Sequence, residues 1–340
     1  CGNYFNQKRN LMLTIESEVL ARHEHLFDGK SLLFFGHIRD NFASQCKNST
    51  KVEVVSQYFD YANQHTKVEF SLENHHQADL GIFYWTKNKQ ECQFQLYQWL
   101  SQAPIGQTLL IVGENRAGVR SVEKILSPFG EIAKIDSARR CGLYYFNLQT
   151  NPNFDYKTFW KSYRLQALNI FALPAVFSSA ELDGGTHLLL STFETEKLSG
   201  KVLDLGCGAG VIGATLKQQN PNIDLTLSDI HAMALASTTR TLEENALKGE
   251  VVASDVFSHI DGRFDLIVSN PPFHDGIDTA YQAVEKLILE AKQHLNRGGE
   301  LRIVANAFLP YPDLLDKAFG SHQLLAKSNK FKVYSAKNYR

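Results

Sequence analysis

Apolar and polar positions in the second half of the chain alternate between two kinds of segment. Short apolar runs, such as residues 264–269, are typical of buried strands. From about 279 to 295, apolar residues instead follow one face of a helix, which is expected to stop at Arg297-Gly298-Gly299. This alternation predicts a parallel, doubly wound α/β sheet. The expected strands are 201–205, 223–228, 250–253, 264–269 and 300–305, with 323–326 and 331–336 as a closing antiparallel hairpin.

The first half of the chain shows the same rhythm more faintly, with strands expected at 31–36, 80–85 and 108–112. The segment 104–112 parallels 296–304, and each follows a strand by one helix. We interpret this as an internal duplication whose first copy has lost its catalytic residues. The polar, proline-containing segment 149–153 is the expected linker. With Met12 as the expected first residue, the predicted domains are 12–150 and 154–340.

Composition narrows the class of protein. A chain of 340 residues with 44% hydrophobic residues can bury the cores of two domains. It has no apolar run long enough for a membrane span, and the net charge of −1 means that any RNA-binding surface must be local. The five cysteines are scattered, which supports neither a zinc site nor a disulfide framework. A reducing cytoplasm is therefore the expected location.

A glycine-rich turn follows the expected strand 201–205. Its pattern Gly-x-Gly-x-Gly precedes an apolar helical segment, and glycines let a backbone approach a ligand with positive φ. Acidic residues stand at the ends of this strand and of the next two, where carboxylates can bind ribose hydroxyls or an adenine amino group. The turn therefore predicts a site for an adenosine-bearing cofactor. The candidate cofactor-binding residues are Asp204, Gly206, Gly208, Gly210, Asp229 and Asp255.

Two other interpretations of this turn stay open from the residues alone. Gly208-x-Gly210-x-x-Gly213, with Asp229 downstream, matches the dinucleotide fingerprint of nicotinamide enzymes. That match leaves Asp204 and Gly206 without a role. The second interpretation is a tight turn of an α/β domain that binds no ligand.

The corner Asn270-Pro271-Pro272-Phe273 ends the expected strand 264–269 and carries the candidate chemistry. An exocyclic amine on a base is a poor nucleophile, because its lone pair is delocalised into the ring. The side-chain oxygen of Asn270 and the carbonyl of Pro271 can accept its two N–H groups, and Phe273 can stack on the base. Acceptors placed in this way stabilise the positive charge that develops on nitrogen in the transition state. The corner therefore indicates methyl transfer to a base or amide nitrogen, unless it is a plain loop.

The chain resembles the RsmC family of 16S ribosomal RNA guanine-N2 methyltransferases, which use S-adenosylmethionine. The resemblance covers nearly the whole chain from Met12. The segment 173–178 is similar to the part of the family that covers the cofactor, which would place Phe177 near it. The most specific matches are the segments 112–121, 136–144, 204–210, 270–276 and 302–312.

The resemblance implies two tandem Rossmann-like methyltransferase domains. The C-terminal domain would be catalytic, with a mostly parallel seven-stranded sheet closed by an antiparallel hairpin. The N-terminal domain would be a degenerate copy that supports folding and binds RNA. The implied substrate is one guanine of 16S rRNA in the small ribosomal subunit, with S-adenosylhomocysteine as product. No metal, no DNA and no membrane are expected to take part, and the protein is expected to be a monomer.

The corner by itself does not select the substrate. The same corner serves adenine-N6 and glutamine-amide methyltransferases, and a non-catalytic ribosome assembly factor is a further alternative. RNA contacts are predicted in the first domain, where Tyr84 and Trp85 are candidate stacking surfaces. The candidate phosphate-binding residues are Lys87, Lys89, Arg116, Arg120, Arg139 and Arg140.

Overall fold

The computed structural model describes residues 12–176, 180–271 and 277–339, and it divides into two compact units. The first ends at Phe159 and the second begins at Trp160. The division therefore falls later than the expected linker 149–153. The physical reason is packing: Asn151 donates hydrogen bonds from Nδ2 to the carbonyls of Leu100 and Ala103, both at 2.8 Å, and the Phe159 ring packs on Phe94.

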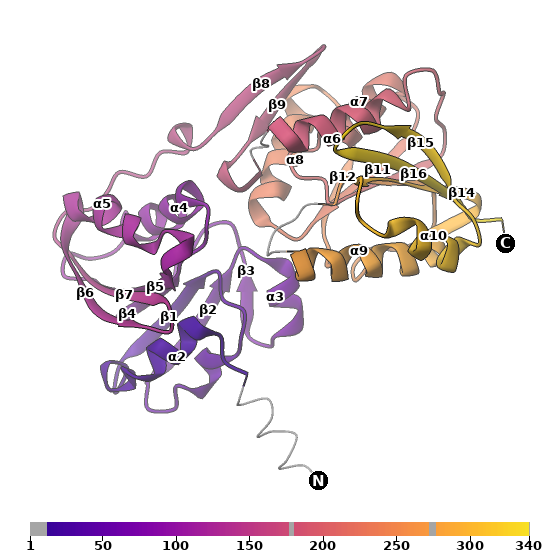
Figure 1. Cartoon of the computed structure of the whole chain (residues 1–340). Coiled ribbons are helices and arrows are strands. Elements are labelled where there is room, and N and C mark those ends of the chain that lie inside the picture. Colours follow the sequence, from indigo (N-terminus) through magenta and orange to yellow (C-terminus); the bar gives the residue numbers. More distant parts are fainter. Residues whose placement is uncertain (1–11, 177–179, 272–276, 340) are drawn as a thin grey trace, which may run out of the picture. The chain divides into compact units, whose positions relative to one another are not determined.

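The first unit is built on a seven-stranded sheet (Figure 1). Its central strands are almost continuously apolar because helices cover both faces. The first five strands in the sheet order are parallel, and the last two pair antiparallel to their neighbours. The order is β3 (Val68–Phe70), β2 (Lys51–Ser56), β1 (Ser31–Gly36), β4 (Leu80–Tyr84), β5 (Thr108–Glu114), β7 (Cys141–Leu148) and β6 (Gly130–Ala138).

The second unit repeats this topology strand for strand. Five parallel strands are again followed by an antiparallel pair, which confirms the predicted sheet and its closing hairpin. The shared order supports the duplication inferred from the sequence. The order is β12 (Glu250–Ala253), β11 (Asp224–Asp229), β10 (Lys201–Leu205), β13 (Phe264–Ser269), β14 (Leu295–Asn306), β16 (Phe331–Lys337) and β15 (Gln323–Lys327).

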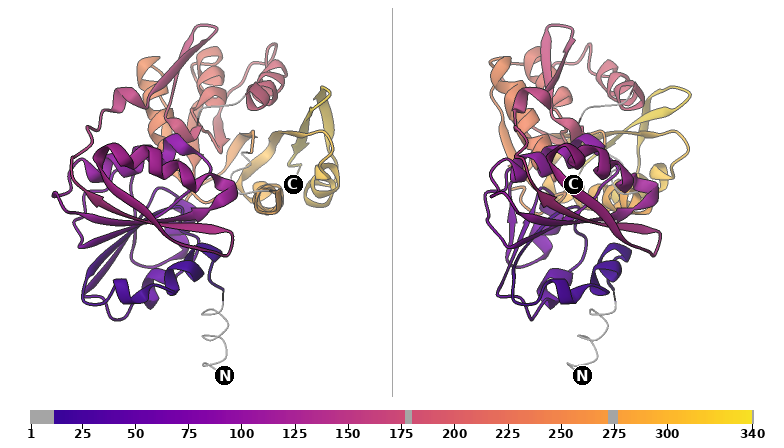
Figure 2. Two further views of the ribbon diagram at one scale, coloured as in Figure 1. Left: turned by 60° about the vertical axis from the view of Figure 1, so that its left-hand side comes forward. Right: turned by 90° about the vertical axis from the view of Figure 1, so that its left-hand side faces the viewer.

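Each sheet has one apolar core on each face, as expected for alternating side chains in buried strands. In β10, Val202 belongs to one core and Leu203 to the other. Figures 1 and 2 show the helical layers of each unit. In the first unit, α2 (Ile15–Ala21) and α3 (Phe59–Gln64) oppose α4 (Lys89–Leu100) and α5 (Val122–Leu126); in the second, α6 (Ala180–Ser191), α7 (Val211–Gln219) and α8 (Ala232–Glu244) oppose α9 (Ile277–Ala291) and α10 (Tyr311–Phe319).

The predicted end of the helix before β14 was wrong. Helix α9 ends at Ala291, a 3₁₀ turn covers Lys292–His294, and β14 begins at Leu295, so Arg297-Gly298-Gly299 lies inside the strand. The pairing of β13 and β14 shifts register between Phe264 and Leu266, and Gly298 has a φ of +81°. Gly298 therefore allows an irregularity within the strand and does not cap a helix.

A two-stranded hairpin that the sequence did not reveal opens the second unit. It consists of β8 (Lys161–Leu165) and β9 (Leu168–Ala172) and packs on α8. The Phe171 amide donates to Thr241 Oγ1 at 3.1 Å, and the Leu173 amide donates to Ser237 Oγ at 3.0 Å. These bonds use hydroxyls that α8 carries on its buried face.

Two properties of the described residues concern membrane insertion and metal binding. Among the helices in these ranges, none is long and apolar enough to cross a membrane. The same ranges hold no group of three or more histidine, cysteine, aspartate or glutamate side chains that could bind a metal ion.

Candidate functional site

The glycine-rich turn joins β10 to α7, which confirms the strand–turn–helix context that the sequence predicted. The amides of Gly206 and Cys207 both donate to the carbonyl of Ser228 at the end of β11, at 2.8 and 2.9 Å. Gly206, Gly208 and Gly210 have φ values of +75°, +54° and +82°, which L side chains rarely adopt. A Cβ on Gly208 would meet nothing within 4 Å, so the space beside this residue is open to a ligand.

Asp204, near the end of β10, is fully buried beneath this turn. Its Oδ2 accepts the amide of Gly213 at 2.9 Å, whereas its Oδ1 has no partner within the described structure. Burial raises the pKa of this carboxyl to about 7, the nearby charge of Asp229 raises it further, and the Gly213 amide opposes both. A buried acceptor without a partner is costly, so a ligand donor that reached Oδ1 would relieve that cost.

Asp229 ends β11 and fixes the turn to that strand. Its Oδ2 accepts the amide of Gly208 at 2.9 Å, and its Oδ1 accepts the amides of Ile230 and His231 at 2.7 and 3.1 Å. Half-buried Asp255 follows β12. Because β12, β11 and β10 are neighbours in the sheet, three carboxylates meet along one carboxyl edge.

Cys207 inside the turn is buried, and its Sγ lies 3.2 Å from Thr238 Oγ1. Burial raises the pKa of this thiol well above its usual value. A thiol that stays protonated is a poor nucleophile, so Cys207 acts as a small packing residue of the turn.

Asn270 follows β13, the strand on the other side of β10. Its Nδ2 donates to Thr186 Oγ1 of α6 at 3.0 Å. This bond uses the donor end of the amide, and within the described ranges Oδ1 makes no hydrogen bond. Both Asn270 and Pro271 are half-buried, so they are accessible at the edge of the sheet. Pro272 and Phe273 of the corner lie outside the described residues, as does Phe177.

Sequence reasoning missed two residues beside Asn270. Thr186 is far away along the chain, and no motif marked it. Phe331, the first residue of β16, lies against α6: a Cβ on Gly185 would be 3.3 Å from the Phe331 ring and 3.5 Å from Asn270 Nδ2. Helical spacing in α6 would reveal only an apolar face, so tertiary packing alone brings these groups together.

The six cationic candidates gather at the carboxyl edge of the first sheet. Lys87 and Lys89 follow β4, Arg116 and Arg120 follow β5, and Arg139 and Arg140 form the turn between β6 and β7. All six are exposed. Two are already paired within the first unit: Arg116 with Glu114, and Arg139 with Glu18. The structure therefore brings the predicted cations to one edge, and four of them make no ion pair with another described residue.

Tyr84 and Trp85 are not available as stacking surfaces, so that expectation was wrong. Both side chains are buried, at 1% and 4% exposure. The Tyr84 hydroxyl lies 2.6 Å from Ser17 Oγ, and Trp85 donates from Nε1 to the carbonyl of Ala117 at 2.9 Å. The first domain uses these aromatics in its own core because the strand end faces packed helices.

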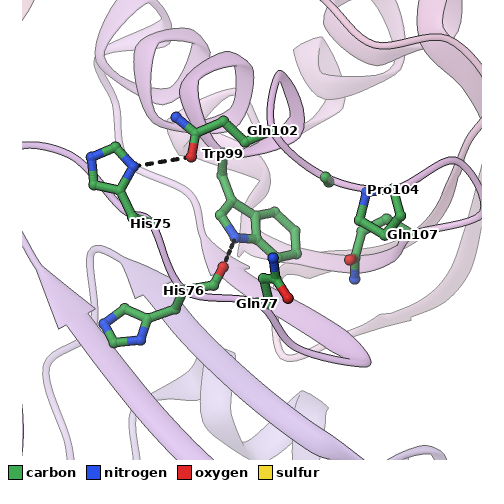
Figure 3. Close-up of a pocket in the computed structure, with 8 residues that line it drawn as sticks. His75, His76, Gln77, Trp99, Gln102, Pro104 and Gln107 are labelled. Atoms are coloured by element: carbon green, nitrogen blue, oxygen red, sulfur yellow. Dashed lines mark hydrogen bonds between the residues drawn. The ribbon is translucent and has the colours of Figure 1, made fainter.

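A separate pocket in the first unit has a volume of about 40 Å³ (Figure 3). Trp99 donates from Nε1 to the His76 carbonyl at its base, and His75 Nδ1 lies 3.0 Å from Gln102 Oε1 at its rim. The Gln102 and Glu73 hydrogen bonds raise the pKa of His75. The volume admits water molecules rather than an adenosine-bearing ligand.

Comparison with known families assigns both units. The methyltransferase small domain matches residues 167–335, and the methyltransferase small domain N-terminal family matches residues 17–163. Relatives named ribosomal RNA small subunit methyltransferase C are similar over 96% of this chain and 100% of their own length. They are 74% identical in Actinobacillus pleuropneumoniae serotype 5b (strain L20) and 69% identical in Haemophilus ducreyi.

A solved structure has the same fold. It is a 16S rRNA N2 methyltransferase of T. thermophilus in complex with AdoMet and guanosine. The two sequences are 23% identical, and the two structures superimpose with a TM-score of 0.78. The match covers 91% of this chain and 88% of the solved chain. These similarities confirm the tandem methyltransferase fold, and they favour a methyltransferase over a nicotinamide enzyme at the glycine-rich turn.

Proposed function

Because this chain belongs to the ribosomal RNA small subunit methyltransferase C family, we propose that it methylates the exocyclic N2 of one guanine in 16S rRNA. The methyl donor in this proposal is S-adenosylmethionine. The observation that carries the proposal is the hydrogen bond from Asn270 Nδ2 to Thr186 Oγ1, at 3.0 Å. The bond uses the donor end of the amide, and in this proposal the acceptor end, Oδ1, receives a hydrogen bond from the amino group of the base.

The residues of the glycine-rich turn fit the methyl donor. Asp204 offers a buried Oδ1 without a partner, and Gly208 leaves open space beside the turn. Asp229 and Asp255 would hold the ribose and the adenine amino group, and Gly206 and Gly210 would keep the backbone close. When bound, S-adenosylmethionine supplies an electrophilic methyl on a sulfonium, and in-line attack by guanine N2 leaves S-adenosylhomocysteine.

Asn270 and the carbonyl of Pro271 would act on the guanine amine. Two acceptors facing the N–H groups localise the nitrogen lone pair and stabilise the positive charge that develops there. The product amine loses its proton readily, so no general base is needed before the attack. Phe273 would stack on the flipped guanine, and Phe177 would lie near the methyl donor.

The first unit would bind the rRNA of the small subunit through its carboxyl-edge cations. Four of these cations are exposed and make no ion pair in the part of the chain that the structure describes: Lys87, Lys89, Arg120 and Arg140. Arg116 and Arg139 would exchange an internal partner for phosphate. In this proposal the domains are 12–150 for RNA binding and 154–340 for catalysis, and the protein acts as a monomer in the cytoplasm.

The decisive experiment measures transfer of labelled methyl from S-adenosylmethionine. The acceptors are small subunits, large subunits, free rRNA and a glutamine-bearing polypeptide, and products are digested to nucleosides. Label in N2-methylguanosine from small subunits supports the proposal. Label in N6-methyladenosine or in protein would keep the Asn270 chemistry and overturn the substrate. Subunit binding without label would identify an assembly factor.

Two variants separate the roles of the site. Asn270→Ala is expected to remove turnover while cofactor affinity is retained, because its oxygen acts on the acceptor amine. Asp229→Ala is expected to weaken cofactor binding, since it removes a ribose acceptor and the partner of the Gly208 amide. Calorimetric titration with S-adenosylhomocysteine measures the second effect without turnover.

A further inference from the structure

Phe308 is the most exposed phenylalanine of the described ranges, at 82%, and it stands two residues beyond the end of β14. The turn that carries it is held by the backbone. The Ala307 amide donates to the Lys330 carbonyl at 2.8 Å, and the Leu309 amide donates to the Asn306 carbonyl at 3.1 Å. Leu309 packs against the core, so Phe308 is held outward on a fixed turn.

The tip of the β15–β16 hairpin adjoins Phe308 through the Ala307–Lys330 hydrogen bond. The tip is ordered by two bonds: the Ser328 amide donates to the Phe331 carbonyl at 2.8 Å, and the Phe331 amide donates to Ser328 Oγ at 3.1 Å. Lys327 and Lys330 are exposed on either side of it. The turn that carries the exposed ring is therefore hydrogen-bonded to a hairpin tip that presents two exposed lysines.

This tip belongs to the same edge as Asn270. Ser269 pairs with Ile303 in the parallel ladder, and Asn306 pairs with Phe331 further along the same strand. A Cβ on Gly185 of α6 would lie 3.3 Å from the Phe331 ring and 3.5 Å from Asn270 Nδ2. Phe331, which follows the hairpin tip, therefore lies close to the same residue of α6 as Asn270.

We infer that Phe308, with Lys327 and Lys330, is a docking surface for the RNA strand that flanks the target guanine. The inference rests on the proposed function. When one base is flipped out, its neighbours lose stacking partners, and an exposed aromatic ring can stack on any of them. The lysines supply the charge that a phosphate backbone requires. With a net charge of −1, the protein as a whole does not attract RNA, so the positive charge that binds RNA has to be local, as it is at this tip.

The test measures binding without turnover. Small subunits are titrated with the full chain in the presence of S-adenosylhomocysteine. Phe308→Ala is expected to weaken binding about 5- to 150-fold, and Phe308→Trp is expected to retain it. Leu324→Ala is the matched control, since Leu324 is an exposed apolar residue nearer the other end of the same hairpin. Equal melting temperatures establish that the variants fold.

Salt dependence tests the lysines separately. Lys327→Ala with Lys330→Ala is expected to reduce the slope of log affinity against log salt concentration by about 0.7 for each lysine. In the methylation assay, Phe308→Ala should raise the KM for subunits while kcat at saturation stays near wild type. A purely structural role for Phe308 would lower kcat as well.

Three outcomes would overturn the docking surface: wild-type affinity of Phe308→Ala, an equal loss in Leu324→Ala, or a change in self-association measured by light scattering instead of a change in RNA affinity. The proposed function fails in a different way. If the wild-type protein transfers no methyl to guanine N2 but Phe308→Ala still loses subunit affinity, the surface stands and the chemistry does not.

Discussion

The carboxyl edges of the two sheets differ although the strand orders are the same. After β10, the chain makes a turn of three glycines with positive φ, and after β13 it presents Asn270. In the first unit, β1 ends at Gly36 and is followed by His37, and the chain buries Trp85 directly after β4. The edge of the second unit is open beside Gly208, whereas the edge of the first unit carries a buried tryptophan and exposed basic residues.

This difference shows that the sheet and the site depend on different residues. The strand order is fixed by apolar side chains on both faces, which the two units share in kind. The chemistry depends on a few loop positions that the core does not need. Loops at one edge can therefore be replaced by packing and basic residues without a change in topology.

The sharpest test of the comparison is Asn270→Ala. We expect kcat to fall by about 10²–10³-fold, because an acceptor for the developing positive charge is lost. Thr86→Ala, in the loop after the equivalent strand β4, is the matched control and should leave kcat unchanged. Steady-state methylation of small subunits measures both. Similar rates for Asn270→Ala and wild type would contradict the assignment of the catalytic edge.

The next test compares two glycines that both have a positive φ. Gly208 and Gly29 have φ values of +54° and +71°, and a Cβ on either would meet nothing within 4 Å. Alanine at each should cost about 1–2 kcal/mol of stability through the left-handed backbone. Only Gly208→Ala should also weaken S-adenosylhomocysteine binding, by more than about tenfold, because its methyl group points into the cofactor space. Equal affinities in calorimetry would show that the turn is not the cofactor site.

The buried carboxyl of Asp204 should make cofactor binding in the second unit depend on pH. Its pKa of about 7 is higher than in the unfolded chain, so ionisation is disfavoured in the free protein and its contribution to stability falls as pH rises from about 4 to 7. A ligand donor at Oδ1 favours the carboxylate. Cofactor affinity should therefore rise about tenfold from pH 6 to pH 8, as ionisation goes from about 10% to about 90%.

Asp204→Asn provides the control for this pH dependence, since the titration of the ligand itself is present in both proteins. The variant should lose the rise in affinity between pH 6 and pH 8. A persisting rise would assign the titration to another group.

The smallest expected effect is that of Thr186→Ala. Loss of one hydrogen bond to Asn270 should lower kcat about two- to tenfold, because the amide can then rotate away from its productive orientation. Thr186→Ser should restore the rate, since it keeps the hydroxyl. Subunit KM should not change in either variant. A change in KM alone would assign Thr186 to RNA binding instead.

Several elements could be read from local patterns. The strands 201–205, 250–253 and 264–269 were predicted with the bounds that the structure has, because each is a compact apolar run between polar turns. The glycine-rich turn was predicted with its positive φ values, since no other residue suits them. The hairpin of β8 and β9 was missed, because its strands are partly exposed and are stabilised by hydroxyls of α8.

The sequence by itself determined the doubly wound architecture, the glycine-rich turn and the acceptor corner, since each depends on spacing within a short segment. Only the tertiary structure decided that Thr186 orients Asn270, that Asp204 keeps a buried oxygen without a partner, and that Tyr84 and Trp85 are core residues. These facts depend on segments that are distant along the chain and meet only when helices pack on the sheets. Local periodicity does not predict these long-range contacts, because burial and pairing are properties of the whole fold.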